Sequence, residues 1–501
     1  MNQATGPLFD KAFSFILSFW RSSILTLIGG FCLLGLVMTL FVPPFQVPDE
    51  PAHWLAGYGR TVPKVLSEGP NQHCSIANAL PDAFEPGRIA FRFGEKVEGR
   101  NFTAVANLKE TCADHSLSYG MIGTYPGILV ARLLTTGESE FPHKTFQVFI
   151  LGRVCQGALL VFLVMRLFIV SQATHRLLPG MLTMVAGMLS PLFLQQSFAI
   201  SADGLTFAVV LSLLFFLFFM KEAKWFDWAV LLFVAGTVGG TKPPLFAPIP
   251  VFLIAGLFRA HRESGRQSTL PALRWTPTML VLITVLASLA CAIWVVSKGH
   301  NVPAGQYLGR DLSLSRQLTH TMESPMRVFK MVKRTVKGFL TFDLLTGPLG
   351  WLDTPISGWT KVRFWQILIV AMVADLVFGV FLFGDSLRRK FSIKRWTVNV
   401  VWSSVLVLAL IGAAYLVALV LYLTWSPVGA RNIDGLQGRY FLPMLLALPL
   451  VVGTLFTGGS CSIEGNYAPQ KVASLGGGVV FGYLVALLLC PLYLDLVYRW
   501  W

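Results

Sequence analysis

Residues 24–54 read ILTLIGGFCLLGLVMTLFVPPFQVPDEPAHW, and this stretch decides the fold. Its first part, residues 24–42, is an apolar run long enough to cross a bilayer. Prolines then end the helix, because proline lacks an N–H donor and clashes with the preceding turn. Asp49, Glu50 and His53 follow directly. Carboxylates are unfavourable so close to hydrocarbon, which indicates a functional site where the first span ends.

Composition places the whole chain in the same class. Of its 501 residues 54% are apolar and only 13% are charged, and the mean hydropathy is +0.64. These values exclude an ordinary soluble globule, and continuous apolar runs argue against a β-barrel. The first run is too long for a signal peptide and is predicted to be retained. We therefore expect an all-α polytopic membrane protein that forms a single membrane domain over residues 1–501.

Hydropathy predicts eleven spans, and two basic connections set their orientation. Four arginines follow residue 258, and five basic residues lie between 388 and 395 without an acid among them. The positive-inside rule places both connections and the N-terminus in the cytoplasm. Counting residues 119–134 as a span would invert every later loop, so we expect a re-entrant or interfacial helix there. The spans lie near 22–42, 146–171, 177–199, 202–220, 226–241, 244–258, 276–297, 363–386, 397–424, 440–457 and 474–497.

Two large loops, residues 43–145 and 298–362, are predicted on the outer face. The second contains an amphipathic helix, with apolar residues from Met326 to Phe339 at helical spacing and basic residues on the flanking face. This helix either lies on anionic lipid or cradles a lipid phosphate. The net charge of +15 is attributed to such lipid contacts and to cytoplasmic loops, and no nucleic-acid partner is expected.

Cysteine positions agree with this topology. Cys74 and Cys112 share the first outer loop, whereas the other cysteines fall in spans or in an inner loop. In an oxidising compartment the two should form a disulfide. The alternative, two free thiols in a reducing compartment, would contradict the orientation.

The acidic pair at the end of the first span is the first catalytic candidate. A helix resuming near Pro51 would place Asp49 and Glu50 at its N-terminus, where the helix dipole favours the anion. Such a carboxylate could take a proton from an acceptor hydroxyl as a general base. Helix capping is the alternative role. His53 is four residues after Asp49 and could share a helix face with it. Asp49, Glu50 and His53 would then form at best a partial metal site. Whether a divalent cation is a cofactor is left open.

Further polar residues gather at the predicted outer face from distant segments, which indicates an outward-facing polar cavity. Each has a plain structural alternative: a turn acid for Asp203, a snorkelling cation for Lys242 and an interfacial anchor for Arg439 with Tyr440. Arg153 lies inside the second span and requires a partner. The candidate substrate-binding residues are His53, Arg153, Asp203, Lys242, Arg439 and Tyr440.

Four segments in order resemble the signature of a bacterial multi-pass membrane family, domain of unknown function 2142. They are residues 45–53 (FQVPDEPAH), 201–204 (SADG), 349–355 (LGWLDTP) and 437–443 (QGRYFLP). Thr241-Lys242-Pro243 is also similar but less specific. The resemblance runs from about residue 20 to 455.

That family is in turn similar to the GT-C glycosyltransferases, a likeness at the level of the fold. It implies a GT-C-like fold in the bacterial inner membrane and inverting transfer of a sugar from a polyprenyl-phosphate lipid to a glycan or lipid-borne acceptor. By this resemblance Asp49 is the catalytic carboxylate and Glu50 an assistant or metal contact, while Lys242 and Arg439 contact the donor phosphate. A transporter or flippase of a lipid-linked glycan is the alternative function.

Overall fold

The computed structural model describes residues 6–44, 46–47, 50, 72–75, 111–114, 141–174, 176, 178–239, 248–264, 313–339, 343–349, 354–390, 393–434, 436–457 and 471–500. Helices dominate these ranges, as expected for a membrane protein. Five of them are long and apolar enough to cross a membrane. They are α1 (Gly6–Phe41), α5 (Phe141–Ala173), α15 (Gly358–Lys390), α16 (Ile393–Trp425) and α18 (Lys471–Trp500).

Shorter apolar helices coincide with four more of the predicted spans. They are α8 (Ala202–Phe219), α9 (Trp225–Gly239), α10 (Pro248–Ser264) and α17 (Leu442–Gly453). The predicted span at 276–297 and the stretch at 119–134 lie outside the described residues. The total of eleven spans and the GT-C-like arrangement therefore stay predictions.

The predicted span at 177–199 is interrupted. Its residues form α6 (Met181–Gly187) and α7 (Pro191–Ser197), two helices whose residues are all buried. Pro191 cannot continue a helix from the preceding turn, and it starts the new helix instead. The Ser190 side chain caps α7 by accepting a hydrogen bond from the Phe193 N–H at 3.3 Å. Helix α7 ends in the polar residues Gln195, Gln196 and Ser197, which are therefore buried inside the bundle.

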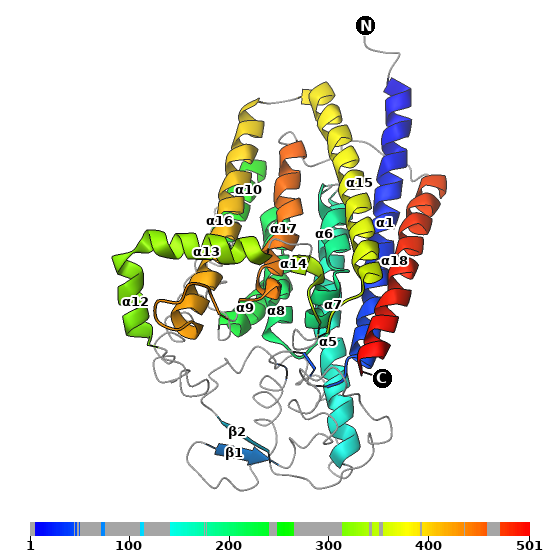
Figure 1. Ribbon diagram of the computed structural model, residues 1–501. Coiled ribbons are helices and arrows are strands. Elements are labelled where there is room, and N and C mark those ends of the chain that lie inside the picture. Colours follow the sequence, from blue (N-terminus) through cyan, green and yellow to red (C-terminus); the bar gives the residue numbers. More distant parts are fainter. Residues whose placement is uncertain are drawn as a thin grey trace.

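The bundle has two chemically different ends. At one end lie the start of α1, the end of α15 and the start of α16 (Figure 1). Phe258 of α10 meets Trp402 of α16 there, with ring centroids 5.4 Å apart, so both predicted basic connections begin at this end. We call it the basic end. At the other end α1 and α18 finish, which agrees with the predicted alternation; the cytoplasmic assignment stays a prediction.

A two-stranded sheet lies at the end opposite the basic end (Figure 1). Strand β1 (Gln72–Ser75) pairs antiparallel with β2 (Thr111–Asp114). The prediction of an all-α fold did not include this sheet. In the register Cys74 stands directly opposite Cys112. Opposed residues in antiparallel strands have Cα atoms about 4.5–5.5 Å apart, which is within the span of a disulfide.

In the second large loop, α12 (Leu314–Glu323) and α13 (Pro325–Phe339) form an arm beside α16, so the predicted amphipathic helix is present (Figure 1). Met331 and Val332 are buried in a small cluster with Tyr422 and Ile433. Phe329 is 54% exposed. The apolar face of α13 is therefore shared between the bundle and its surroundings.

One buried carboxylate ties three helices together. Asp375, in the middle of α15, accepts hydrogen bonds from Trp20 Nε1 of α1 at 2.8 Å and from the Thr183 N–H and Oγ1 of α6 at 2.7 and 2.8 Å. Trp20 also stacks on Phe378 with ring centroids 4.7 Å apart. Asp375 is thus a structural contact between helices.

Replacing Asp375 by Ala should lower the free energy of unfolding by about 3 kcal/mol, because buried donors of Trp20 and Thr183 lose their acceptor. The measurement is thermal unfolding of the detergent-purified protein. Val373→Ala is the control on the same helix, since Val373 is 55% exposed and should change stability by less than about 0.5 kcal/mol. Equal unfolding temperatures for the two variants would contradict a structural role for Asp375 between the three helices.

The strand register predicts that the native protein contains a disulfide between Cys74 and Cys112. Non-reducing peptide mapping should recover the linked peptides, and Cys112→Ser should abolish the link. Cys490, a free and exposed cysteine, serves as the internal control for alkylation. Quantitative alkylation of both loop thiols in freshly extracted protein would disprove the pairing.

Candidate functional site

A buried ion pair joins the end of the first span to α5. Arg153 and Glu50 are both fully buried, and they meet through Nε–Oε1 and Nη2–Oε2 contacts of 2.8 and 2.6 Å. Arg153 also donates to the backbone oxygens of Val42 at 2.5 Å and Pro43 at 3.1 Å. Both carbonyls lie just past Phe41, the last residue of α1, where the prolines prevent the helix from continuing. A cation at a helix C-terminus is also favoured by the helix dipole.

The Glu50 carboxylate also accepts a hydrogen bond from the chain that follows α7. The Ile200 N–H donates to Glu50 Oε1 at 3.0 Å. Phe198 anchors this turn, because its ring fills the space that side chains at Gly35 of α1 and Gly157 of α5 would occupy. A Cβ at either glycine would lie about 2.0–2.1 Å from the ring, so the close approach requires glycine at both positions. Glu50 therefore accepts hydrogen bonds from two separate segments.

A second buried ion pair involves Asp203, three residues after Ile200. Arg439 belongs to the short helix η5 (Gly438–Tyr440), and its Nε lies 3.2 Å from Asp203 Oδ2 at the start of α8. Both side chains are at most 5% exposed. The Arg439 guanidinium also faces the Tyr440 ring at 5.2 Å, and its Nη2 donates to the Tyr440 hydroxyl at 3.4 Å. The predicted grouping of Asp203, Arg439 and Tyr440 is present.

Hydrogen bonds and the backbone of α5 link the two ion pairs. Ser201 caps α8 by accepting from the Asp203 N–H at 3.0 Å, and its carbonyl accepts from Gln156 Nε2 at 2.8 Å. Gln156 lies on α5 within one turn of Arg153. Gly204 permits this arrangement, because a Cβ there would lie 2.0 Å from Gln156 Nε2. We call the connected set of Glu50, Arg153, Gln156, Ser201, Asp203 and Arg439 the ion-pair network.

The segment that contains residues 349–355 approaches the same place. Helix α14 (Asp343–Thr346) packs against α7 and η5, and Ser190 Oγ hydrogen bonds to the Leu345 carbonyl. Leu349 and Thr354 exchange backbone hydrogen bonds of 2.8 and 3.1 Å, and both are buried. The two ends of that segment are therefore fixed next to the helices that carry the network.

Neutral side chains close to the network residues in the sequence retain hydrogen-bonding capacity. Among the described residues, buried polar atoms without a hydrogen-bond partner include Gln46 Nε2, both side-chain polar atoms of Gln195, Gln196 Nε2, Ser197 Oγ and Gln437 Oε1. Gln46, Gln195, Gln196 and Ser197 are at most 1% exposed. Such groups are rare in proteins because an unmade buried hydrogen bond is unfavourable. Gln195, Gln196 and Ser197 were not predicted, although their polarity within an apolar segment was an available signal, and Gln46 and Gln437 were noted only as parts of the family signature.

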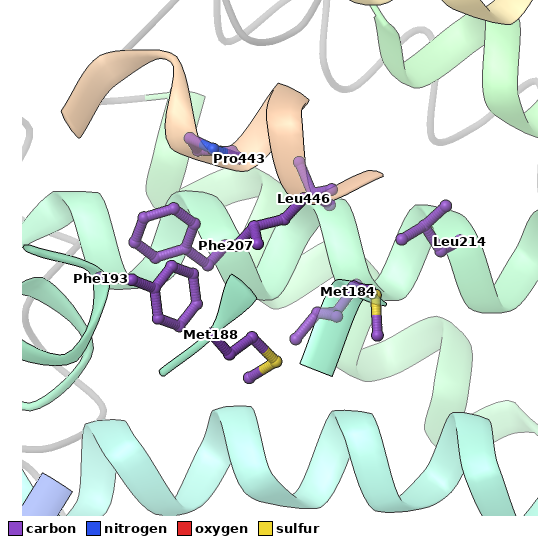
Figure 2. Close-up of a pocket in the computed structure, with 9 residues that line it drawn as sticks. Met184, Met188, Phe193, Phe207, Leu214, Pro443 and Leu446 are labelled. Atoms are coloured by element: carbon purple, nitrogen blue, oxygen red, sulfur yellow. The ribbon is translucent and has the colours of Figure 1, made fainter. Parts of the chain in front are cut away.

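Behind the network the core is apolar. Phe193 of α7 and Phe207 of α8 pack with ring centroids 4.1 Å apart, and Pro443 and Leu446 of α17 lie over them (Figure 2). The void that these side chains line measures about 10 Å³, at the lower limit for one water molecule. This packing fixes the ends of α7, α8 and η5 relative to one another.

Three of the predicted site residues, Asp49, His53 and Lys242, lie outside the described residues. Their predicted roles in catalysis, substrate binding and metal binding stay predictions. Within the described residues there is no group of three or more His, Cys, Asp and Glu side chains that could hold a metal ion. Glu50, the described member of the candidate metal set, is already bound by Arg153.

Substituting Glu50 by Gln should destabilise the protein by about 3–5 kcal/mol, because Arg153 would remain as a buried cation without its counter-ion. Thermal unfolding in detergent and the amount of folded protein in the membrane measure this loss. Glu222→Gln is the matched control at the basic end: its pair with Arg176 is 3.3 Å long and partly exposed, so the loss should stay below about 1 kcal/mol. A fully stable Glu50→Gln protein would contradict the structural role.

Comparison with known proteins gives one match. No curated protein and no solved structure matches the chain. Residues 127–448, well over half of the chain, match a family described as predicted membrane protein (DUF2142). The matched range contains both Asp203 and Arg439, and it begins after residues 45–53. The chain therefore belongs to the DUF2142 family of predicted membrane proteins.

Proposed function

We propose that this membrane protein is a glycosyltransferase that moves a sugar from a polyprenyl-phosphate lipid to an acceptor hydroxyl, on the outer face of the bacterial inner membrane. The ion-pair network carries the proposal: it collects buried acidic and basic side chains from the chain that follows α1 and from α5, α8 and η5 at one end of the bundle. Buried ionic groups in membrane proteins usually mark functional sites, and this network adjoins Asp49 in the chain.

The two neighbouring carboxylates have different parts in this proposal. Glu50 accepts three hydrogen bonds, from Arg153 Nε, from Arg153 Nη2 and from the Ile200 N–H. These contacts occupy the carboxylate oxygens, and the Glu50 side chain is 0% exposed, so an acceptor hydroxyl cannot reach it. Asp49 therefore serves as the general base in this proposal, and Glu50 anchors the chain immediately after it.

The reaction step follows from this division. The acceptor oxygen attacks the anomeric carbon of the sugar while the bond between that carbon and the phosphate oxygen breaks. The acceptor proton passes to the Asp49 carboxylate, and the lipid phosphate leaves with the bonding electron pair. Attack opposite to the leaving group inverts the anomeric configuration. Stabilising the charge that develops on the phosphate is the larger catalytic requirement.

Cations for the leaving phosphate come from Lys242 and Arg439 in this proposal. Arg439 has a planar guanidinium suited to phosphate, and Tyr440 beside it is only partly buried. Arg153 is given a structural part instead. It is fully buried, and its hydrogen bonds already go to Glu50 and to the carbonyls that end α1.

The neutral amides around the network suit the sugar itself. A carboxamide offers both a donor and an acceptor, which matches the hydroxyl groups of a sugar ring. Gln46, Gln195 and Gln196 provide this capacity from buried positions beside the network. Recognition by such groups is specific, because a ligand without matching hydroxyls would leave them unpaired.

Replacing Asp49 by Asn should lower sugar transfer by at least about a hundredfold, because the variant lacks the base, while stability stays close to that of the wild type. A deletion strain complemented with each variant supplies the material. Mass spectrometry should show the polyprenyl-phosphate sugar accumulating and one envelope sugar missing. Protein amount and unfolding temperature are measured in parallel.

Glu323→Gln is the control, since Glu323 is an exposed acid on α12 whose replacement should leave transfer unchanged. Wild-type glycans in the Asp49→Asn strain would refute the assignment of the base. Loss of transfer together with loss of folded protein is the result expected for Glu50→Gln instead.

A further inference from the structure

A second site lies at the basic end, away from the ion-pair network. A cavity of about 320 Å³ opens between α10, α16 and the short helix η6 (Thr454–Thr457), with the end of α8 forming part of its wall. Its size falls within the usual range for small-molecule sites, about 300–1,000 Å³. Arg153 lies in the half of α5 nearer its start, whereas the cavity residue Leu217 lies at the end of α8. The two residues are therefore near opposite ends of the bundle.

The lining of this cavity is amphiphilic. Leu217, Ala255 and Leu406 are buried apolar residues that form the inner wall, and Trp402 packs there against Phe258. Ser403 and Thr454, which hydrogen bond to each other, and Asn399 add neutral polar groups. Arg259 and the exposed His261 lie on the last turns of α10 and also line the cavity. An apolar wall next to a cation fits a ligand with a hydrocarbon part and an anionic head.

The surface around the cavity is apolar as well. Phe258 is 57% exposed, Val398 is 40% exposed and the neighbouring Val401 is 55% exposed. On a membrane protein these side chains face lipid, so the ligand can enter from the bilayer. The wider surroundings are mainly basic: Arg176, Lys221, Arg262 and Lys394 lie at this end, whereas the acid Glu222 pairs with Arg176.

We propose that this cavity binds an anionic phospholipid, with the phosphate at Arg259 and an acyl chain against Leu217 and Leu406. Basic pockets between membrane helices on the positively charged side commonly hold anionic lipid headgroups. Phe218 supports the geometry, since its ring lies 5.1 Å from the Arg259 guanidinium carbon and holds that side chain at the end of α8. The site is independent of the proposed glycosyl transfer.

Native mass spectrometry of the full-length, delipidated protein in detergent tests the site. Phosphatidylglycerol is the anionic probe, and phosphatidylcholine is the zwitterionic one. We expect one phosphatidylglycerol to be retained in preference to phosphatidylcholine. Arg259→Gln should weaken its retention by about tenfold, because a charge-assisted contact is lost. Val398→Trp should reduce retention by filling the cavity mouth.

Two matched variants are the controls. Lys394→Gln removes an exposed cation at the same end that does not line the cavity, and Val401→Trp enlarges an exposed residue one turn from Val398. Both should retain the lipid, and unfolding temperatures identify any variant that fails to fold. Equal retention of the two lipids, equal losses in Arg259→Gln and Lys394→Gln, or unchanged retention in Val398→Trp would overturn the proposal. Displacement of the lipid by inorganic phosphate alone would also overturn it, by assigning the site to free phosphate.

Discussion

The buried guanidinium of Arg153 is the constraint on which the rest of the structure depends. A charge at 0% exposure among apolar helices is tolerated only with an excellent counter-ion and satisfied hydrogen bonds. Glu50 is the counter-ion, and the carbonyls just past the end of α1 accept the remaining hydrogen bonds. Because those partners lie just past the first span, the charge forces the chain leaving α1 to fold back against α5.

The two ion pairs hold the segments of the site together, and of their four residues the proposed reaction uses Arg439 alone. Glu50 and Arg153 are occupied by each other, and Asp203 holds Arg439 at the start of α8. What the network leaves available is neutral hydrogen-bonding capacity on Gln46, Gln195 and Gln196. A scaffold of paired charges beside unpaired amides suits a polar, hydroxyl-rich ligand more than a bare anion. The anion-binding character is stronger at the basic end, where Arg259 lines a cavity.

Sequence patterns predicted much of this architecture, for identifiable reasons. Long apolar runs fixed α1, α5, α15, α16 and α18, because length and hydropathy suffice to recognise a span. The need of Arg153 for a partner was also predictable, but its pairing with Glu50 was not, because that pairing depends on how the chain turns after the prolines. The interruption at Pro191 was missed because the apolar residues on both sides of it read together as one stretch long enough to span a membrane. The strand pair was missed because segments of four residues carry little periodicity.

The coupling free energy between Glu50 and Arg153 tests the central claim most directly. A double-mutant cycle with Glu50→Gln, Arg153→Met and the combined variant isolates this quantity from the unfolding free energies. If the pair organises the end of the bundle, the double variant should be more stable than the sum of the single losses predicts, by at least about 1.5 kcal/mol. Additive losses would show that the two side chains act independently and would contradict the account.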